Sequence, residues 1–166
     1  IERWKQFREA LSKQNVDLYL LLRKLFDDDG PRLLVVGDTI VDQYVACDPV
    51  GMSNEAPVIV VKELEARSYL GGAAIVAAHV AALQAQTTFL SVNGRDENAE
   101  FVESTLKDLG VKTQFIEDQS RPTTFKIRYM VENQKLFRVS RLKEHSISKE
   151  KEELAIKIIR EQAKEV

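Results

Sequence analysis

Two aspartates follow the first strongly apolar run of the sequence, at a place where ligands commonly bind in α/β proteins. The run "RLLVVGD" ends in Asp38, and three residues separate it from Asp42. In open α/β sheets, ligands bind beyond the carboxyl ends of the strands. We therefore interpret the two carboxylates as acceptors for the hydroxyl groups of a sugar. The spacing alone supports equally well a second interpretation, in which Asp38 caps a turn and Asp42 is solvated.

A glycine pair at the start of the least polar helix is the second candidate. Gly71 and Gly72 open the stretch "GGAAIVAAHVAALQA". Glycine lets a ligand approach the backbone, and the free N–H groups at a helix start favour acceptor oxygens. Close packing of the helix on a sheet is the commoner reason for such a pair. The stretch matches neither the Walker phosphate loop nor the dinucleotide-binding glycine motif.

Lys126 and Arg128 form the third candidate, because residues two positions apart share one face of a strand. A cationic face of this kind binds phosphate groups. The alternative is a solvated edge strand whose charges protect it from pairing with other chains. Without further context this alternative is favoured.

The composition argues against several classes of function. Of 166 residues, 44% are hydrophobic and 30% are charged, and the net charge of −2 gives no basic field that would recruit nucleic acid. Two histidines and the single Cys47 are poor material for a zinc site, so we expect no metal ligands. No segment approaches the roughly 20 apolar residues of a membrane helix. We therefore expect a cytoplasmic protein with no membrane partner.

Hydrophobic periodicity predicts the elements that position these residues. Residues 1–31 are typical of a helical lead-in or linker that ends at Gly30 and Pro31. The expected strands are 32–38 (buried on both faces), 41–47, 58–67, 87–94, 111–117 and a hairpin of 123–131 with 135–142; the expected helices are 71–85, 96–110 and 146–166, the last with Ser148 as N-cap. The alternation indicates a parallel sheet covered by helices, and the paired strands that interrupt it indicate a small β flap.

Five segments, in order along the chain, carry a resemblance to a known family. They are "VVGDTIVDQY", "SNEAPVIVVK", "GGAAIVAAHVAAL", "NGRD" and "PTTFKIRYMVENQKLFRV". Together they resemble the N-terminal half of a ribokinase-family (PfkB-type) carbohydrate kinase. Within that family they are most similar to the heptose 7-phosphate kinase and ADP-heptose synthase group. The resemblance covers about residues 32–142.

This resemblance implies an α/β fold, the N-terminal part of a ribokinase-like three-layer sandwich with a small β-strand lid. Residues 32–166 would belong to this domain, with lid strands at about 42–67 and 123–142 that also form a homodimer. The implied reaction is ATP-dependent transfer of phosphate to a hydroxyl of a sugar or sugar phosphate, with ATP and Mg²⁺ as cofactors. The residues implied at the substrate are Asp38, Asp42, Gly71 and Gly72 around the sugar, with Lys126 and Arg128 toward the substrate or its phosphate.

Several positions depart from the family pattern. The asparagine of the GGAA-N-VA helix is Ile75 here, and the arginine after the second aspartate is Gln43. Asn54, Gly51 and Ser140 replace a proline, an arginine and an aspartate of the pattern. A branched aliphatic side chain cannot make the hydrogen bonds of asparagine to sugar hydroxyls. The alternative function is therefore a non-catalytic binding or assembly module that dimerises through its lid.

The family's G-A-G-D motif, which supplies the general base and the anion hole, does not occur in this sequence. Phosphoryl transfer depends on positioning and on stabilising spread negative charge. We therefore expect no catalytic residue in this chain, and we expect it to be an inactive part of a longer kinase. The H-x-G-H pattern of a fused nucleotidyltransferase is also absent from the sequence.

Overall fold

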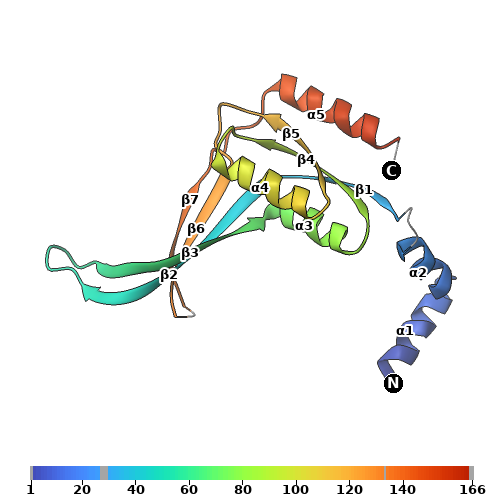
Figure 1. Ribbon diagram of the computed structural model, residues 1–166, viewed down its shortest axis with the longest axis horizontal. Coiled ribbons are helices and arrows are strands. Elements are labelled where there is room, and N and C mark those ends of the chain that lie inside the picture. The colour runs from blue at the N-terminus through green and yellow to red at the C-terminus, as the bar shows by residue number, and fades with distance from the viewer. Residues whose placement is uncertain (1, 27–29, 133, 165–166) are drawn as a thin grey trace.

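The chain folds into two β-sheets with helices packed around the first (Figure 1). A computed structural model describes residues 2–26, 30–132 and 134–164. The first sheet holds the parallel strands β1 (Arg32–Val36), β4 (Gln86–Asn93) and β5 (Lys112–Glu117) in the order β1-β4-β5. The second sheet holds β2 (Thr39–Met52), β3 (Ile59–Gly71), β6 (Thr124–Val131) and β7 (Gln134–Arg141) in the order β3-β2-β6-β7. The helices are α1 (Glu2–Lys13), α2 (Leu18–Phe26), α3 (Gly72–Ala82), α4 (Glu97–Asp108) and α5 (Lys149–Gln162).

Helices α3 and α4 cover one side of the first sheet and α5 lies on the other side, which confirms the predicted α/β class and its layered arrangement (Figure 1). Local signals set the helix ends. Asp96 accepts the N–H of Ala99 at 3.0 Å and caps α4, and Ser148 caps α5 as predicted by accepting the N–H of Lys151. Helix α3 ends at Ala82, earlier than residue 85, because Gln84 has a positive φ of 70°.

The second sheet, here called the lid sheet, unites the two expected lid segments. Strand β2 pairs with β3 in antiparallel register and with β6 in parallel register, so the hairpins 39–71 and 124–141 form one surface. Both β2 and β3 are longer than predicted, and they extend from the α/β body as a two-stranded arm (Figure 1). A bulge between Ala46 and Cys47 interrupts their register.

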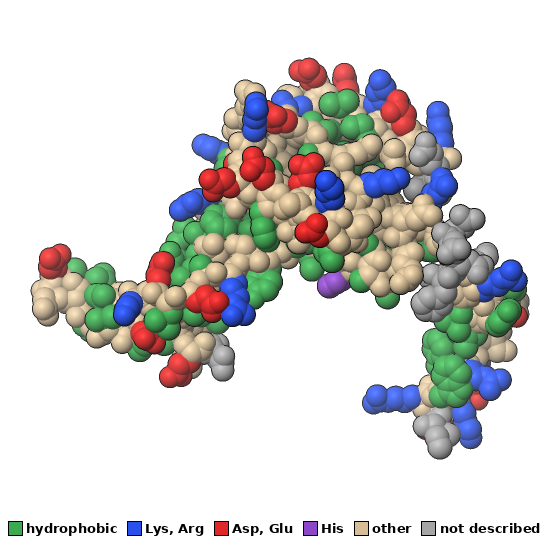
Figure 2. Space-filling view, viewed as in Figure 1, with side chains coloured by type: hydrophobic (Ala, Val, Ile, Leu, Met, Phe, Trp, Pro, Cys, Tyr) green, Lys and Arg blue, Asp and Glu red, His purple; other side chains and the backbone are tan. Residues whose placement is uncertain are grey.

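The N-terminal helices α1 and α2 project from the α/β body on the side away from this arm (Figures 1 and 2). Within α1 no residue is buried. None of the described helices is long and apolar enough to cross a membrane.

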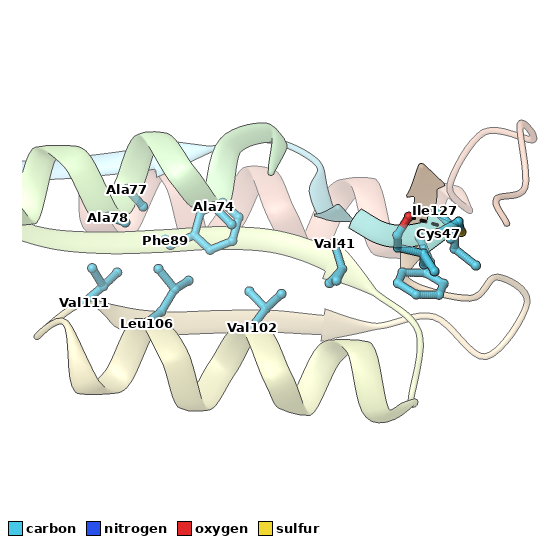
Figure 3. Close-up of a cluster of buried hydrophobic side chains, with 12 residues drawn as sticks. Val41, Cys47, Ala74, Ala77, Ala78, Phe89, Val102, Leu106, Val111 and Ile127 are labelled. Atoms are coloured by element: carbon cyan, nitrogen blue, oxygen red, sulfur yellow. Dashed lines mark hydrogen bonds between the residues drawn. The ribbon is translucent and has the colours of Figure 1, made fainter. Parts of the chain in front are cut away.

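The hydrophobic core lies between α3, α4 and the first sheet and continues into the buried face of β2 and β6 in the lid sheet (Figure 3). The buried side chains of α3 are alanines, which let the helix approach β4 closely, while Phe89 fills the centre with no exposed surface. Helix α4, on the same side of the sheet as α3, contributes the fully buried Val102 and Leu106. This packing holds the N-terminus of α3 in a fixed position relative to the first sheet.

One prediction about the first sheet is wrong. We expected the run 32–38 to be buried on both faces, but Leu33 and Val36 are 41% and 50% exposed. Within the described residues β1 lies at the edge of its sheet and pairs with β4 alone. An apolar run therefore indicates a strand here, but it does not indicate how many neighbours that strand has.

Candidate functional site

The carboxylate of Asp42 lies against the backbone of Gly71. A Cβ atom added to Gly71 would stand 2.6 Å from Oδ2 of Asp42, so only glycine leaves room for this carboxylate. The two residues face each other because β2 and β3 pair with Ile40 opposite Gly71 and Asp42 opposite Tyr69. The strand pairing thus carries an aspartate to the start of α3.

A second contact joins the other aspartate to the other glycine. The carbonyl oxygen of Asp38 accepts the N–H of Ala73 at 3.0 Å. Gly72 has a φ of +56°, and a Cβ there would stand 2.5 Å from the same carbonyl oxygen. The turn after β1 is therefore docked on the first residues of α3. The structure thus brings Asp38, Asp42, Gly71 and Gly72 to one place.

The N-terminus of α3 has no side-chain cap. Gly71 is the N-cap residue and has no side chain that could accept a hydrogen bond, whereas Asp96 and Ser148 cap α4 and α5 with their side chains. The first N–H groups of a helix lack intrahelical partners and favour acceptor oxygens. The Ala73 N–H is taken by the carbonyl oxygen of Asp38, so the helix start and the adjoining Asp42 carboxylate offer the remaining donors and an acceptor to a polyhydroxy ligand.

The Arg128 guanidinium binds Asp42 from the neighbouring strand β6. Its Nη1 donates to Oδ1 of Asp42 at 2.5 Å, and the two side chains are 17% and 22% exposed. The guanidinium also lies 5.2 Å from the ring centroid of Tyr44, in cation–π range. One oxygen of Asp42 is thus used by Arg128, and the other faces Gly71.

The same face of the lid sheet carries further cations. Lys126 is half-buried and lies directly across from Asp42 in register. Arg138 of β7 lies directly across from Arg128. Like charges opposite one another on neighbouring strands repel, so this face favours an anion.

A buried chain of hydroxyl and amide groups supports the turn that carries Asp38. Thr39 donates to Oγ of Ser91 from both its N–H (3.1 Å) and its hydroxyl (2.9 Å). Ser91 in turn donates to Oδ1 of Asn93 at 3.1 Å. Asp38 itself is exposed and lines a cavity of about 390 Å³ together with Thr124 and His145.

The base of the β6–β7 hairpin is held by a buried ion pair at Asp118. Ser120 donates its hydroxyl to Oδ1 of Asp118 at 2.7 Å, and Nε of Arg121 donates to Oδ2 at 2.9 Å. Lys151 of α5 is 3.7 Å from Oδ1. The hydrogen bonds from Ser120, with those of Arg121 and the charge of Lys151, lower the pKa of Asp118 to about 2 even though burial opposes the shift.

This ion pair also reaches the residues that follow β7. Nη2 of Arg121 donates to the carbonyl oxygen of His145 at 2.9 Å, and Nε2 of His145 lies 2.9 Å from the Ser120 hydroxyl. Because that hydroxyl gives its one proton to Asp118, Nε2 of His145 is the donor. The hinge cluster (Asp118, Ser120, Arg121, His145) therefore ties the entry of β6 to the exit of β7.

Sequence reasoning missed three parts of this region. Tyr44 follows Asp42 by two positions, and that alternation was the available signal for a shared face. The position of Arg138 opposite Arg128 depends on the hairpin register, which the sequence left open. The hinge cluster joins residues up to 27 positions apart and has no local signal.

Comparison with known proteins identifies the family of this chain. A family profile described as pfkB family carbohydrate kinase matches residues 31–164. The D-beta-D-heptose 7-phosphate kinase of Bordetella bronchiseptica is 44% identical over 108 residues, which are 65% of this chain and 34% of that protein. The bifunctional protein HldE of Pseudomonas aeruginosa is 43% identical over 112 residues, 68% of this chain and 24% of that protein. The matched part of the chain thus spans 34% and 24% of the lengths of these two relatives.

Solved structures share the fold at low sequence identity. Phosphofructokinase-2 of Escherichia coli, in complex with substrates and products, aligns with a TM-score of 0.61 at 16% identity, over 78% of this chain and 41% of that one. Ribokinase of Arabidopsis thaliana, complexed with ribose and ATP, aligns with a TM-score of 0.52 at 20% identity, over 74% and 41%.

Proposed function

Because this chain belongs to the pfkB family of carbohydrate kinases, we propose that it forms the acceptor side of a kinase that phosphorylates a hydroxyl of a sugar phosphate. The observation that carries the proposal is the contact of Asp42 with Gly71 beside that of Asp38 with Gly72. Carboxylates accept hydrogen bonds from hydroxyls, and the uncapped start of α3 donates them. Together they bind and orient a polyhydroxy acceptor, and orientation is a large part of phosphoryl-transfer catalysis.

A phosphate on the acceptor fits the cationic face of the lid sheet. Arg128 is neutralised by Asp42, whereas Lys126 and Arg138, which lie beside it, form no salt bridge with any of the described residues. An anion held among them offsets their mutual repulsion. The heptose 7-phosphate kinase among the relatives makes a heptose phosphate the first acceptor to test.

The proposed cofactors are ATP and Mg²⁺, and the chain contains no Walker phosphate loop and no G-A-G-D motif. Among the described residues no group of three or more His, Cys, Asp or Glu side chains has the geometry of a metal site. The residues described here therefore fit neither cofactor, and their proposed roles concern the acceptor. A kinase that draws on ATP would act in the cytoplasm.

The lid sheet is the proposed cover of the acceptor and the proposed dimer contact. Its second face is apolar: Tyr129 and Phe137 stack at 4.6 Å, and Phe137 remains 51% exposed beside Val139. Figure 2 shows hydrophobic side chains gathered along these strands. Contact of two such faces in a homodimer removes that apolar surface from water. Closure of the polar face over the sugar excludes water from the phosphoryl group.

A non-catalytic binding or assembly module is the second candidate, and Ile75 is the observation that favours it. Ile75 lies in the first turn of α3, four residues after Gly71, and packs against the hydrophobic core. It offers no hydrogen bond at a position where the family pattern has asparagine. In this candidate the lid sheet still dimerises, but no sugar binds.

Calorimetric titration separates the two candidates. We expect the 166-residue chain to bind a heptose 7-phosphate or a hexose phosphate, and we expect the full gene product to release ADP when ATP and the same acceptor are present. Phosphate-free sugars provide the control for the cationic face. Stable dimers without binding of any sugar or sugar phosphate would overturn the kinase proposal and support the assembly module.

A further inference from the structure

Helix α1 carries an exposed aromatic stripe outside the family domain. The family match begins at residue 31, so α1 and α2 are additional to it. Trp4, Phe7 and Leu11 follow one another at spacings of three and four, which places them on one side of the helix. The Trp4 and Phe7 rings lie 5.7 Å apart, and the two residues are 53% and 46% exposed. None of the residues of α1 is buried by the rest of the described chain.

Charge is arranged around this aromatic stripe in a definite order. Arg8 lies four residues after Trp4, and Arg3 lies four residues before Phe7, so a basic side chain borders each edge of the stripe. Glu2 and Glu9 are two positions from those aromatic residues, which on a helix is the opposite side. The acidic side chains are therefore turned away from the stripe and the arginines flank it.

Helix α2 also exposes apolar side chains and contains no acidic residue. Asp17 caps it by accepting the N–H of Tyr19 at 2.8 Å, and of its nine residues seven are apolar and two are basic. Tyr19 and Leu20 are 72% and 53% exposed. Residues 2–26 contain six basic and three acidic side chains, a formal charge of +3, whereas the whole chain carries −2.

We propose that α1 and α2 form a docking surface for an anionic lipid bilayer. Exposed aromatic and leucine side chains bordered by arginines are the composition of helices that lie in the headgroup region, with the apolar side in the acyl boundary and the basic side chains on lipid phosphates. The positive charge of these helices on an acidic chain complements an anionic surface. Both helices project from the α/β body on the side away from the β2–β3 arm (Figure 1).

This surface association needs no membrane-spanning segment. The expectation of no membrane partner rested only on the length of apolar runs, and a helix that lies in the interface is not subject to that criterion. The proposal is independent of the proposed kinase activity, because none of its residues belongs to the candidate sugar site.

Trp4 is the only tryptophan in the chain and reports directly on the proposed contact. We expect its emission to shift to shorter wavelength and increase when the full chain is titrated with vesicles of phosphatidylcholine and phosphatidylglycerol. Vesicles of phosphatidylcholine alone should give a much weaker response, and high salt should weaken binding to the anionic vesicles. No shift, or equal binding to both kinds of vesicle, would overturn the proposal.

Matched substitutions within α1 separate the docking surface from general effects of charge and folding. Arg3→Gln and Arg8→Gln should each weaken binding to anionic vesicles by about fivefold. Phe7→Ser should weaken it at least as much, whereas Gln6→Ser, on the polar side of the same helix, should leave it unchanged. Sedimentation without lipid tests a second copy as the occupant. If Phe7→Ser dissociates an oligomer and Arg8→Gln leaves vesicle binding unchanged, the surface binds another copy of the chain and the lipid proposal is wrong.

Discussion

The Asp42 carboxylate is held between Arg128 on one side and the bare backbone of Gly71 on the other. The two contacts leave the carboxylate one fixed position at the start of α3. The three residues lie on three different strands, so the position of the carboxylate depends on the pairing of β2 with both β3 and β6.

Replacing Asp42 by asparagine should remove sugar-phosphate binding and lower stability. Asp42→Asn leaves the partly buried Arg128 without a charged partner, at a cost of about 1–2 kcal/mol in the free energy of unfolding. Loss of a charged hydrogen-bond acceptor should weaken binding of the sugar phosphate by about tenfold or more. Calorimetry and urea unfolding measure the two effects. Asp48→Asn, on an exposed part of the same strand, is the control and should change neither.

Adding a methyl group at Gly71 should weaken binding more than it weakens the fold. Gly71 has a φ of −135°, which alanine adopts without strain, but the new Cβ would stand 2.6 Å from Oδ2 of Asp42. The carboxylate must move, and acceptor affinity should fall by about tenfold. Gly110→Ala is the opposite case: its φ is +77° and no atom lies within 4 Å, so we expect lower stability and unchanged binding. Equal affinity in Gly71→Ala and the unaltered chain would contradict the assigned position of Asp42.

Much of this fold could be predicted because its signals are local. Helix α4 was bounded by its apolar stripe and by Gly110, and Ser148 was identified as a cap from its place before an amphipathic run. The glycine pair and Asp38 were identified as candidates because strand ends and helix starts are where ligands bind. The structure adds contacts among Asp38, Asp42, Gly71 and Gly72, and their role in binding a ligand stays a prediction.

The features that could not be predicted from the sequence depend on strand register and on which strands lie next to each other. The opposition of Arg128 and Arg138 is set by a bulged hairpin, and a slip of one residue would place these side chains on different faces. The exposure of Val36 depends on whether another strand adjoins β1, which no residue of β1 encodes. The hinge cluster joins Ser120 to His145 across the whole β6–β7 hairpin, so it exists only once that hairpin has formed.

The hinge cluster should make stability depend on pH in the acid range. The pKa of Asp118 is about 2 in the folded chain, against an ordinary value of 3.8. Because the folded value is the lower one, the stabilisation is present above about pH 4 and is lost as pH falls from 4 toward 2. It corresponds to about 2 kcal/mol at neutral pH. Asp118→Asn should therefore lower the free energy of unfolding by about this amount at pH 7 and by much less near pH 2.

Urea unfolding at several pH values measures this difference, with Glu117→Gln as the control. Glu117 is exposed and adjoins the cluster in sequence, so its variant should follow the unaltered chain throughout. A stability difference for Asp118→Asn that stays constant from pH 7 to pH 2 would show that the carboxylate charge is not what stabilises the base of the hairpin.

Introducing asparagine, the residue of the family pattern, at position 75 tests directly whether the N-terminus of α3 faces a sugar. Ile75 is half-buried in the first turn, so Ile75→Asn loses apolar contacts and should lower stability by about 1–3 kcal/mol. If a polyhydroxy ligand lies at this helix start, the amide gains hydrogen bonds to it and acceptor affinity should rise by about three- to tenfold. Ile75→Ala is the matched control, because it loses the same packing without offering a hydrogen bond. Calorimetry with a heptose or hexose phosphate should therefore give a higher affinity for Ile75→Asn than for Ile75→Ala. Equal affinities in the two variants would show that the sugar does not contact position 75. If neither variant binds a sugar phosphate, the assembly module is favoured.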